Sequence, residues 1–244
     1  MTAPGAPLAA TPRAHAAARP LRVEHRGLVP YDDALALQAE RVDAVRRGAA
    51  PDTLFLLEHP PVVTLGRRAD PAHLRESPAA LAARGVALRT VTRGGDVTWH
   101  APGQLVGYLV CDLAARGAPD VHRFLRGMEA ALIAALAGLG LEAASLHGYT
   151  GVFMARSLAP GAGPPRKVAS IGLGLRGWVS FHGFALNVTN DLAAFGAIVP
   201  CGLRDVRMTS VAAERGRPAD AGRDAALEER TRAAVAAAFA GWLG

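Results

Sequence analysis

Two residues of this chain have the chemistry of a nucleophile and its activator. Cys201 lies in the run Pro200-Cys201-Gly202-Leu203, and the flanking proline and glycine predict a tight turn on which a thiol can be reached. Lys167 is the only lysine in the chain, and it begins the apolar run Val168-Ala169-Ser170-Ile171-Gly172. A cation beside a thiol favours the reactive thiolate form. We therefore expect a nucleophile and cation pair, provided that the fold brings the two residues together.

Each member of this pair also has a simpler interpretation. A free cysteine is most often a small buried hydrophobe, and a lysine that follows the Gly/Pro-rich segment 160–165 is most often a surface residue at the start of a strand. The second cysteine, Cys111, fits the first description because it continues an apolar strand predicted over 104–113. We assign Cys111 to the core and keep Cys201 as the candidate nucleophile.

The densest group of polar residues is the run Arg93-Gly94-Gly95-Asp96-Val97-Thr98-Trp99-His100, which continues as Ala101-Pro102-Gly103-Gln104. Two adjacent glycines let a backbone approach a ligand closely, and Arg93, Thr98 and His100 supply polar groups. The run predicts a ligand-binding loop between two strands. A hairpin turn with a solvated arginine and a core histidine would also explain it.

Other familiar sites are not indicated. The run from Gly172 to Gly177 matches G-x-G-x-x-G, but an apolar, β-branched and aromatic segment follows it where a dinucleotide site needs a helix. We interpret these glycines as a hairpin turn. The histidines have no metal-ligand spacing, and no phosphate-binding G-x-x-x-x-G-K-[ST] run is present. We expect neither a metal nor a cofactor.

Composition restricts the class of protein. The chain has 244 residues, and 27 Lys+Arg against 21 Asp+Glu give a net charge of +6, which favours encounter with an acidic partner. The arginines are dispersed, which is unlike a nucleic-acid interface. No apolar run approaches the ~20 residues of a membrane span, and two cysteines make no disulfide framework. We expect a cytoplasmic protein with reduced thiols that binds neither nucleic acid nor membrane.

The elements that must position these residues are mostly short strands. Residues 1–20, rich in Ala and Pro, predict a disordered extension, and 21–244 a single domain. Strands are expected over 21–25, 53–57, 62–65, 86–92, 104–110, 151–154, 167–171 and 178–188. Helices are expected after Asp32 or Asp33, from Asp120 to a stop at Gly140, and over 222–243. This pattern favours an α+β fold with a mixed or antiparallel sheet and flanking helices.

Four runs in order resemble the lipoyl(octanoyl) transferase family: Arg93 to His100 with Pro102-Gly103-Gln104-Leu105, Lys167-x-x-Ser170-Ile171-Gly172, Phe181-His182-Gly183-x-Ala185-x-Asn187-Val188, and Pro200-Cys201-Gly202. The resemblance spans about residues 22–215. It implies the fold of the biotin and lipoate protein ligase catalytic domain. Two residues depart from the family pattern: Ala101 stands where the family usually has Gly, and Phe184 where it usually has Leu. The first concerns the backbone conformation of the loop, and the second the shape of the acyl pocket.

The resemblance also implies roles for individual residues. Cys201 would carry the acyl thioester, and Lys167 would lower the pKa of its thiol and shuttle protons. The acyl substrate site would be lined by Arg93, Gly94, Gly95, Asp96, Val97, Thr98, Trp99, His100, Ser170, Ile171, Gly172, Gly183, Phe184 and Ala185.

The implied reaction is octanoyl transfer in protein lipoylation. The donor would be octanoyl-acyl carrier protein, and the acceptors lipoyl domains of 2-oxoacid dehydrogenase complexes and the glycine cleavage H protein, with the enzyme acting as a monomer. Two alternatives stay open. One is an ATP-dependent lipoate or biotin ligase of the same fold, and the other is a non-catalytic module that binds acyl groups or lipoyl domains.

Overall fold

A computed structural model describes residues 19–203, 205–218 and 221–244, except for the side chain of Cys201. Residues 1–18 of the predicted N-terminal extension lie outside this range. Among the residues that the structure describes, no helix is long and apolar enough to cross a membrane.

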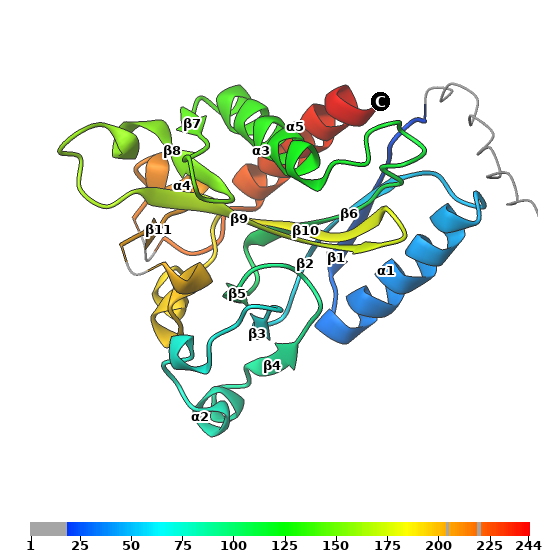
Figure 1. The fold of residues 1–244 in the computed structure, drawn as a ribbon. Helices are drawn as coiled ribbons and strands as arrows, with labels where there is room; N and C mark the ends of the chain where they lie inside the picture. The colour runs from blue at the N-terminus through cyan, green and yellow to red at the C-terminus, as the bar shows by residue number, and fades with distance from the viewer. Residues whose placement is uncertain (1–18, 204, 219–220) are drawn as a thin grey trace, which may run out of the picture.

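An eight-stranded mixed sheet forms the centre of the molecule (Figure 1). Its main path runs through β1 (Arg22–Leu28), β2 (Thr53–Glu58), β6 (Gln104–Val110), β10 (Val179–Asn187), β9 (Arg166–Arg176), β8 (Val152–Met154) and β7 (Ala143–Ala144), while β11 (Arg207–Met208) also pairs with β9. The pairs β1/β2 and β9/β11 are parallel, and the remaining pairs are antiparallel.

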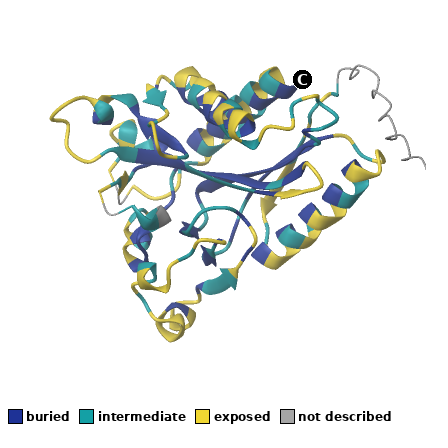
Figure 2. Cartoon of the chain, in the orientation of Figure 1, coloured by how far each residue is buried: buried dark blue, intermediate teal, exposed yellow. Residues whose placement is uncertain are grey.

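Helices cover both faces of this sheet because successive residues of its strands point to opposite sides. In β2, Leu54 and Leu56 join the core cluster beneath α3 (Val121–Gly138) and α5 (Ala225–Leu243). Phe55 and Leu57 join a second cluster against α1 (Tyr31–Arg46) on the other face. The buried residues follow this layering, with exposed residues on the outer sides of the helices (Figure 2).

A second sheet lies on the same side of the central sheet as α1 (Figure 1). It has the order β4 (Ala87–Thr90), β3 (Val62–Leu65) and β5 (Val97–His100). Its core is a third cluster, which includes Leu81 of α2 (Pro78–Ala83) and Phe195 of the 3₁₀ helix η3 (Ala193–Ala197). The short helices that complete the chain are η1 (Pro71–His73), η2 (Ala155–Leu158), η4 (Pro200–Gly202) and α4 (Val211–Glu214).

The predicted α+β class with a mixed sheet and flanking helices is confirmed. The helix predicted after Asp120 is confirmed as α3, because the Asp120 side chain accepts from the Arg123 N–H. The predicted cap of α1 is wrong. This helix begins at Tyr31 after Pro30 without a side-chain cap, and Asp32 instead pairs with Arg89 at 2.8 Å.

The two glycine-containing runs also differ from their predicted limits. The predicted loop over 93–104 contains a strand, β5, because Val97 and Trp99 pack into the third core cluster and fix an extended backbone. The strand β9 continues to Arg176, and its hairpin turns at Gly177 and Trp178, whose φ angles are 55° and 65°. A strand, β10, follows this turn, so the rejection of the dinucleotide motif is confirmed.

Candidate active site

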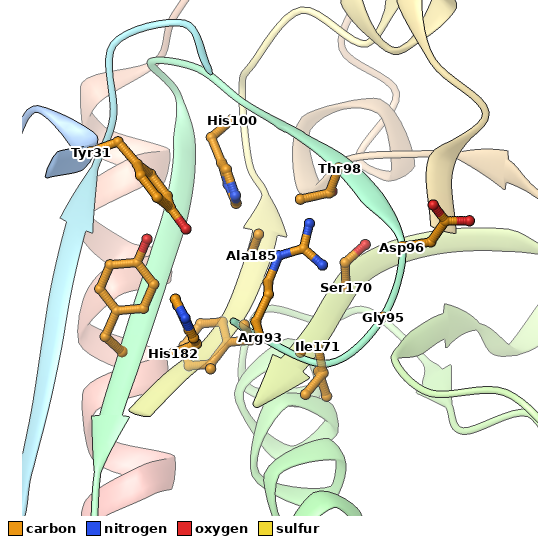
Figure 3. Close-up of a pocket in the computed structure, with 14 residues that line it drawn as sticks. Tyr31, Arg93, Gly95, Asp96, Thr98, His100, Ser170, Ile171, His182 and Ala185 are labelled. Carbon is orange, nitrogen blue, oxygen red and sulfur yellow. The ribbon is translucent and has the colours of Figure 1, made fainter. Parts of the chain in front are cut away.

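A pocket lies where β5, β9 and β10 meet the first turn of α1 (Figure 3). We call it the inner pocket. Its lining combines polar and apolar side chains: Tyr31, Arg93, Gly95, Asp96, Thr98, His100, Tyr108, Ser170, Ile171, Gly172, His182, Gly183, Phe184 and Ala185. Three runs that are far apart in the sequence are therefore brought to one place.

A larger groove adjoins the inner pocket. It has a volume of about 540 Å³, and Gly95, Asp96, Ile171 and Gly172 line both hollows. Lys167 and Gly202 also line this groove, although 35 positions separate them in the chain. A site of this size is in the range of small-molecule pockets.

Alternation along β5 divides its residues between the pocket and the core. Thr98 and His100 line the inner pocket, whereas Val97 and Trp99 face the third core cluster. Successive side chains of a strand point to opposite faces, so all four cannot line one surface. Of the predicted substrate-binding residues, Val97 and Trp99 are the two whose side chains the structure places in this core.

Arg93 links the rim of the inner pocket to strand β3 of the small sheet by hydrogen bonds. Its side chain is buried, and Nη2 donates to the carbonyl and the hydroxyl oxygen of Thr64, each at 2.8 Å. The Gly94 N–H donates to the Leu173 carbonyl of β9 at 2.7 Å. A Cβ on Gly172 would lie 2.7 Å from the Gly94 oxygen, so only glycine permits this approach of loop and strand.

Lys167 is held at the groove wall by the segment before β8. The lysine is 2% exposed, and its Nζ donates to the Thr150 carbonyl at 2.9 Å and lies 5.5 Å from the centre of the Phe153 ring. Gly151 has φ 125°, and a Cβ there would lie 2.5 Å from Lys167 Cε. The lysine is therefore not a surface residue, and glycine at 151 makes room for its side chain.

Glu129 supports this segment from α3. Its Oε1 accepts from the Gly151 N–H at 2.9 Å, and its Oε2 lies 2.7 Å from Arg126 Nη1. Burial raises the pKa of the Glu129 carboxyl, against the opposing effects of the Gly151 N–H, Arg126 and Lys167. No sequence motif indicated Glu129 or Gly151. The available signal was a carboxylate on the buried face of an apolar helix.

The turn that carries Cys201 is the 3₁₀ helix Pro200–Gly202. The Cys201 side chain lies outside the described residues, so the predicted proximity of its thiol to Lys167 stays a prediction. The backbone on either side of the groove can be placed by two contacts. Gly202, with φ 69°, lies against Asp96 and His73, and β11 pairs Met208 with Lys167 a few residues further on. The turn and the lysine strand thus border the same groove.

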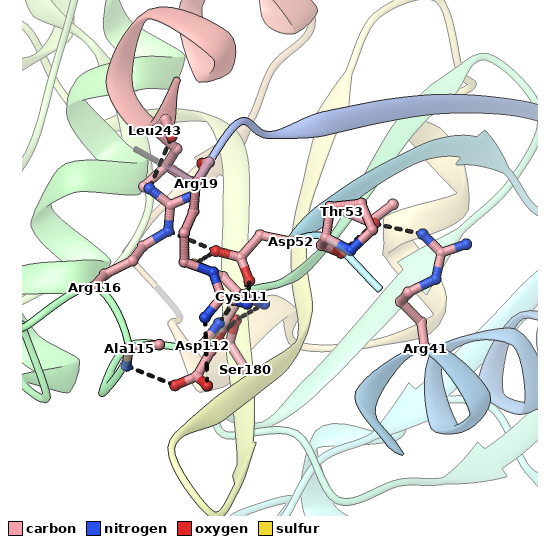
Figure 4. Close-up of polar contacts among 11 residues, drawn as sticks. Arg19, Arg41, Asp52, Thr53, Cys111, Asp112, Ala115, Arg116, Ser180 and Leu243 are labelled. Carbon is pink, nitrogen blue, oxygen red and sulfur yellow. Dashed lines mark hydrogen bonds and ion pairs between the residues drawn. The ribbon is translucent and has the colours of Figure 1, made fainter. Parts of the chain in front are cut away.

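The other cysteine is a core residue, as predicted. Cys111 is buried, and its thiol donates to Asp52 Oδ2 at 3.5 Å within a network that includes Arg116 (Figure 4). Burial is the largest cause of a raised pKa of the Cys111 thiol. A protonated and inaccessible sulfur is a poor nucleophile.

Five ring side chains, Tyr31, His59, His100, Tyr108 and His182, form a buried cluster at the inner pocket. His59 Nδ1 donates to the Val29 carbonyl at 2.7 Å, so its Nε2 accepts from the Tyr108 hydroxyl at 2.7 Å. Burial lowers the pKa of His59 to about 4 and that of His182 to about 3, and holds the pKa of His100 well below its usual value. The three imidazoles are therefore neutral at pH 7.

His182 has an unusual backbone and an unusual ring environment. Its φ is 58°, in the left-handed region, and both ring nitrogens are buried without a hydrogen-bond partner among the described residues. Strain of this kind persists only where surrounding packing fixes it. His182 also lines the inner pocket, and its neutral ring has one donor and one acceptor nitrogen. The sequence assigned no role to His182, although it lies in the family-like run Phe181-His182-Gly183 and is a polar residue in an apolar strand.

The two departures from the family pattern have structural explanations. Ala101 is not among the described residues with positive φ, whereas Gly103 takes φ 85°, so the alanine needs no left-handed conformation. Phe184 packs on Phe239 of α5 with ring centres 5.1 Å apart. Its ring occupies the space where a Cβ on Gly107 would lie, at 2.1 Å, so the glycine accommodates the phenylalanine.

No group of three His, Cys, Asp or Glu side chains that could hold a metal ion occurs within the described ranges.

Comparison with known proteins agrees with this architecture. Residues 30–234 match the family described as the lipoyl protein ligase A/B catalytic domain. An octanoyltransferase from Geobacter sulfurreducens is 44% identical over 221 residues, which cover 91% of this chain and 84% of the relative. An octanoyltransferase from Chloroflexus aurantiacus is 46% identical over 200 residues, covering 82% and 86%.

The fold is also found in a solved structure. The bi-partite lipoate protein ligase of an archaeal lipoylation system from Thermoplasma acidophilum superposes with a TM-score of 0.63 at 19% identity, covering 91% of this chain and 84% of that chain. This likeness concerns the fold, while the sequence matches concern the family. The chain therefore belongs to the lipoyl protein ligase A/B family and, within it, to the octanoyltransferases, which makes it an acyltransferase.

Proposed function

We propose that this chain transfers an octanoyl group from octanoyl-acyl carrier protein to a lysine of lipoyl domains, through an acyl thioester on Cys201. The acceptors would be the lipoyl domains of 2-oxoacid dehydrogenase complexes and the glycine cleavage H protein. The names of the related octanoyltransferases support the acyl group. The acceptor is supported by the Thermoplasma lipoate protein ligase, which was analysed with its E2 lipoyl domain.

The observation that carries the proposal is the shared groove of Lys167 and the Cys201 turn. Lys167, on β9, lines the groove, and so does Gly202, the residue that follows Cys201. A buried lysine in the same groove as this turn is the simplest means of activating the thiol, because an ordinary cysteine is only a few per cent thiolate at pH 7.

The inner pocket is suited to the acyl chain. Ile171, Phe184 and Ala185 supply apolar surface, and the pocket adjoins the groove through four shared residues. Each CH₂ group that leaves water contributes on the order of 0.8 kcal/mol, so an octanoyl chain gains several kcal/mol by entering an apolar site. The carbonyl carbon would then stay in the groove, within reach of the turn.

In the first half-reaction, the Cys201 thiolate attacks the carbonyl of the donor thioester. A new C–S bond forms, the C–S bond to the carrier's phosphopantetheine breaks, and the departing sulfur takes a proton from the Lys167 ammonium. Lys167 is thereby left neutral. Because one thioester replaces another, little free energy changes.

In the second half-reaction, the acceptor amine attacks the thioester carbon. The C–N bond forms, the bond to the Cys201 sulfur breaks, and Lys167 takes a proton from the attacking nitrogen, which restores the thiolate and ammonium pair. The amide product is more stable than the thioester, so the reaction needs no ATP.

The test is acyl transfer to the protein in the absence of an acceptor. Wild-type protein incubated with octanoyl-acyl carrier protein should gain one octanoyl mass that hydroxylamine removes. Cys201→Ser and Lys167→Ala should both fail to transfer octanoate to a lipoyl domain, while their circular dichroism spectra stay unchanged.

Cys111→Ala is the matched control, because it removes the other thiol of the chain from a buried position outside the groove. It should retain the adduct and the transfer activity. Transfer by Cys201→Ser at a rate near that of the wild type would disprove the covalent route. Transfer that occurs only with ATP would identify a ligase instead.

A further inference from the structure

A histidine and aspartate pair lies directly beside the Cys201 turn. His73 Nδ1 is 2.5 Å from Asp96 Oδ2, and the two side chains are only 17% and 12% exposed. Both residues line the groove that also contains Lys167. A Cβ on Gly202 would lie 2.6 Å from Asp96 Oδ2 and 2.9 Å from His73 Cε1, so the pair touches the residue that follows Cys201.

Backbone hydrogen bonds fix the histidine to this turn. The Val199 N–H donates to the His73 carbonyl at 2.8 Å, and the N–H groups of Arg75 and Glu76 donate to the Ala197 carbonyl at 2.9 and 3.2 Å. Leu74 also forms an isolated bridge with Ile198. The segment that carries His73 therefore cannot move independently of the segment that leads into Cys201.

The aspartate is equally fixed, and it sets the tautomer of the imidazole. Asp96 Oδ1 accepts from the Val97 N–H at 2.7 Å and from the Asp70 N–H at 3.2 Å, which leaves Oδ2 for His73. A carboxylate only accepts hydrogen bonds, so Nδ1 of His73 carries the proton and donates. The lone pair of a neutral His73 is therefore on Nε2. Orientation of a histidine base by a carboxylate in this way is the logic of the Ser-His-Asp triad.

The proposed reaction leaves a proton without an acceptor. A lysine side chain is an ammonium ion at neutral pH, so an acceptor lysine loses two protons when it becomes an amide. Lys167 takes one of them and re-forms the pair with the Cys201 thiolate. The other must leave before the nitrogen can attack, and Lys167 cannot hold both.

We propose that His73, oriented by Asp96, is the base that removes the first proton from the incoming lysine ammonium. The N–H bond of the ammonium breaks, Nε2 of His73 takes the proton and later releases it to solvent, and the freed amine attacks the acyl thioester. This assignment rests on the proposed function, and it makes His73 a further catalytic residue that acts only in the second half-reaction.

Two substitutions separate the base from the shape of the site. Asp96→Asn keeps an oxygen for the Val97 N–H but presents an amide N–H to His73, which forces the ring proton onto Nε2 and removes the lone pair from that atom. His73→Asn keeps a donor near Asp96 and has no basic nitrogen. Asp70→Asn is the matched control, because Asp70 caps Ala72 and is exposed.

The experiment starts from isolated octanoyl-enzyme and compares two acceptors. One is a lipoyl domain, whose lysine enters as an ammonium. The other is hydroxylamine, which is already uncharged at neutral pH and has no first proton to lose. Because every variant is assayed from its isolated octanoyl-enzyme, an effect of Asp96→Asn or His73→Asn on formation of the adduct does not enter the comparison. Their transfer to the lipoyl domain should fall by roughly 10²- to 10⁴-fold, the range of general base catalysis, while hydroxylamine cleavage stays unchanged.

Equal losses with both acceptors would show that the pair only supports the turn, and unchanged transfer to the lipoyl domain would show that it does not act as the base. Either result overturns the assignment. Failure of the wild type to form any adduct on Cys201 would instead refute the proposed function, and the assignment with it.

Discussion

Acidification should destabilise this protein well above the pH at which its carboxylates titrate. His59, His100 and His182 are buried as neutral rings, and burial lowers the pKa of His59 to about 4 and of His182 to about 3. In the unfolded chain a histidine has its ordinary pKa of about 6.5. The unfolded state therefore binds more protons below that pH, and stability is lost as the pH falls from about 6.5 towards 4 and 3.

The size of the effect follows from the width of this window. At pH 5, about 1.5 units below the ordinary value, His59 and His182 each contribute a loss of about 2 kcal/mol, at about 1.36 kcal/mol per unit. His59 and His182 together then remove about 4 kcal/mol, and His100 acts in the same direction. Glu129 opposes them, because burial raises its pKa and the folded state gains a proton there. The loss is a large part of the 5–15 kcal/mol typical of a domain.

Urea denaturation at pH 7.5 and at pH 5, followed by tryptophan fluorescence, measures this loss. His182→Asn removes one titrating ring, and asparagine tolerates the left-handed backbone at φ 58°. This variant should lose about 2 kcal/mol less than the wild type between the two pH values. Thr98→Val is the control in the same pocket, and its change in stability should be equal at both pH values. A pH dependence of His182→Asn identical to that of the wild type would refute the reasoning.

Three further predictions concern packing and capping. Gly107→Ala places a Cβ 2.1 Å from the Phe184 ring, so it should cost about 1–3 kcal/mol of unfolding free energy, and Phe184→Leu should recover part of this in a double-mutant cycle. Gly151→Ala crowds Lys167 Cε at a residue with φ 125°, so octanoyl transfer should fall at least tenfold; an unchanged rate would show that the lysine tolerates displacement. Asp120→Ala removes the cap of α3 and should cost about 1 kcal/mol in urea denaturation without changing the transfer rate.

The larger features of the fold were predictable because their signals are local. An alternating or continuous apolar run specifies a strand, and the buried face of α3 recurs at helical spacing after its Asp120 cap. The strand β5 was missed because its four residues alternate between two buried surfaces, and nothing in their composition separates them from a ligand-binding loop. Both faces of β5 become buried only when the small sheet packs into the folded protein, and this packing depends on residues far from β5 in the sequence.

The candidate site divides in the same way. The residues with distinctive chemistry, Cys201, Lys167 and the glycine-rich run from Arg93, could be selected from their types and neighbours. Their supporting groups could not be selected. Glu129 accepts a hydrogen bond from Gly151, which is 22 residues away in the sequence, and His73 bonds to Asp96, which is 23 residues away. Each pair therefore forms only when distant segments pack together.

The sequence by itself determined the class of fold, the family and the chemical types available to the site, because periodicity, turn residues and ordered motifs are carried by neighbouring positions. Only the tertiary structure decided that one groove contains the lone lysine, the turn of Cys201 and an oriented histidine. It also decided that three histidines are neutral, because the pKa of a side chain depends on how completely the folded chain removes it from water.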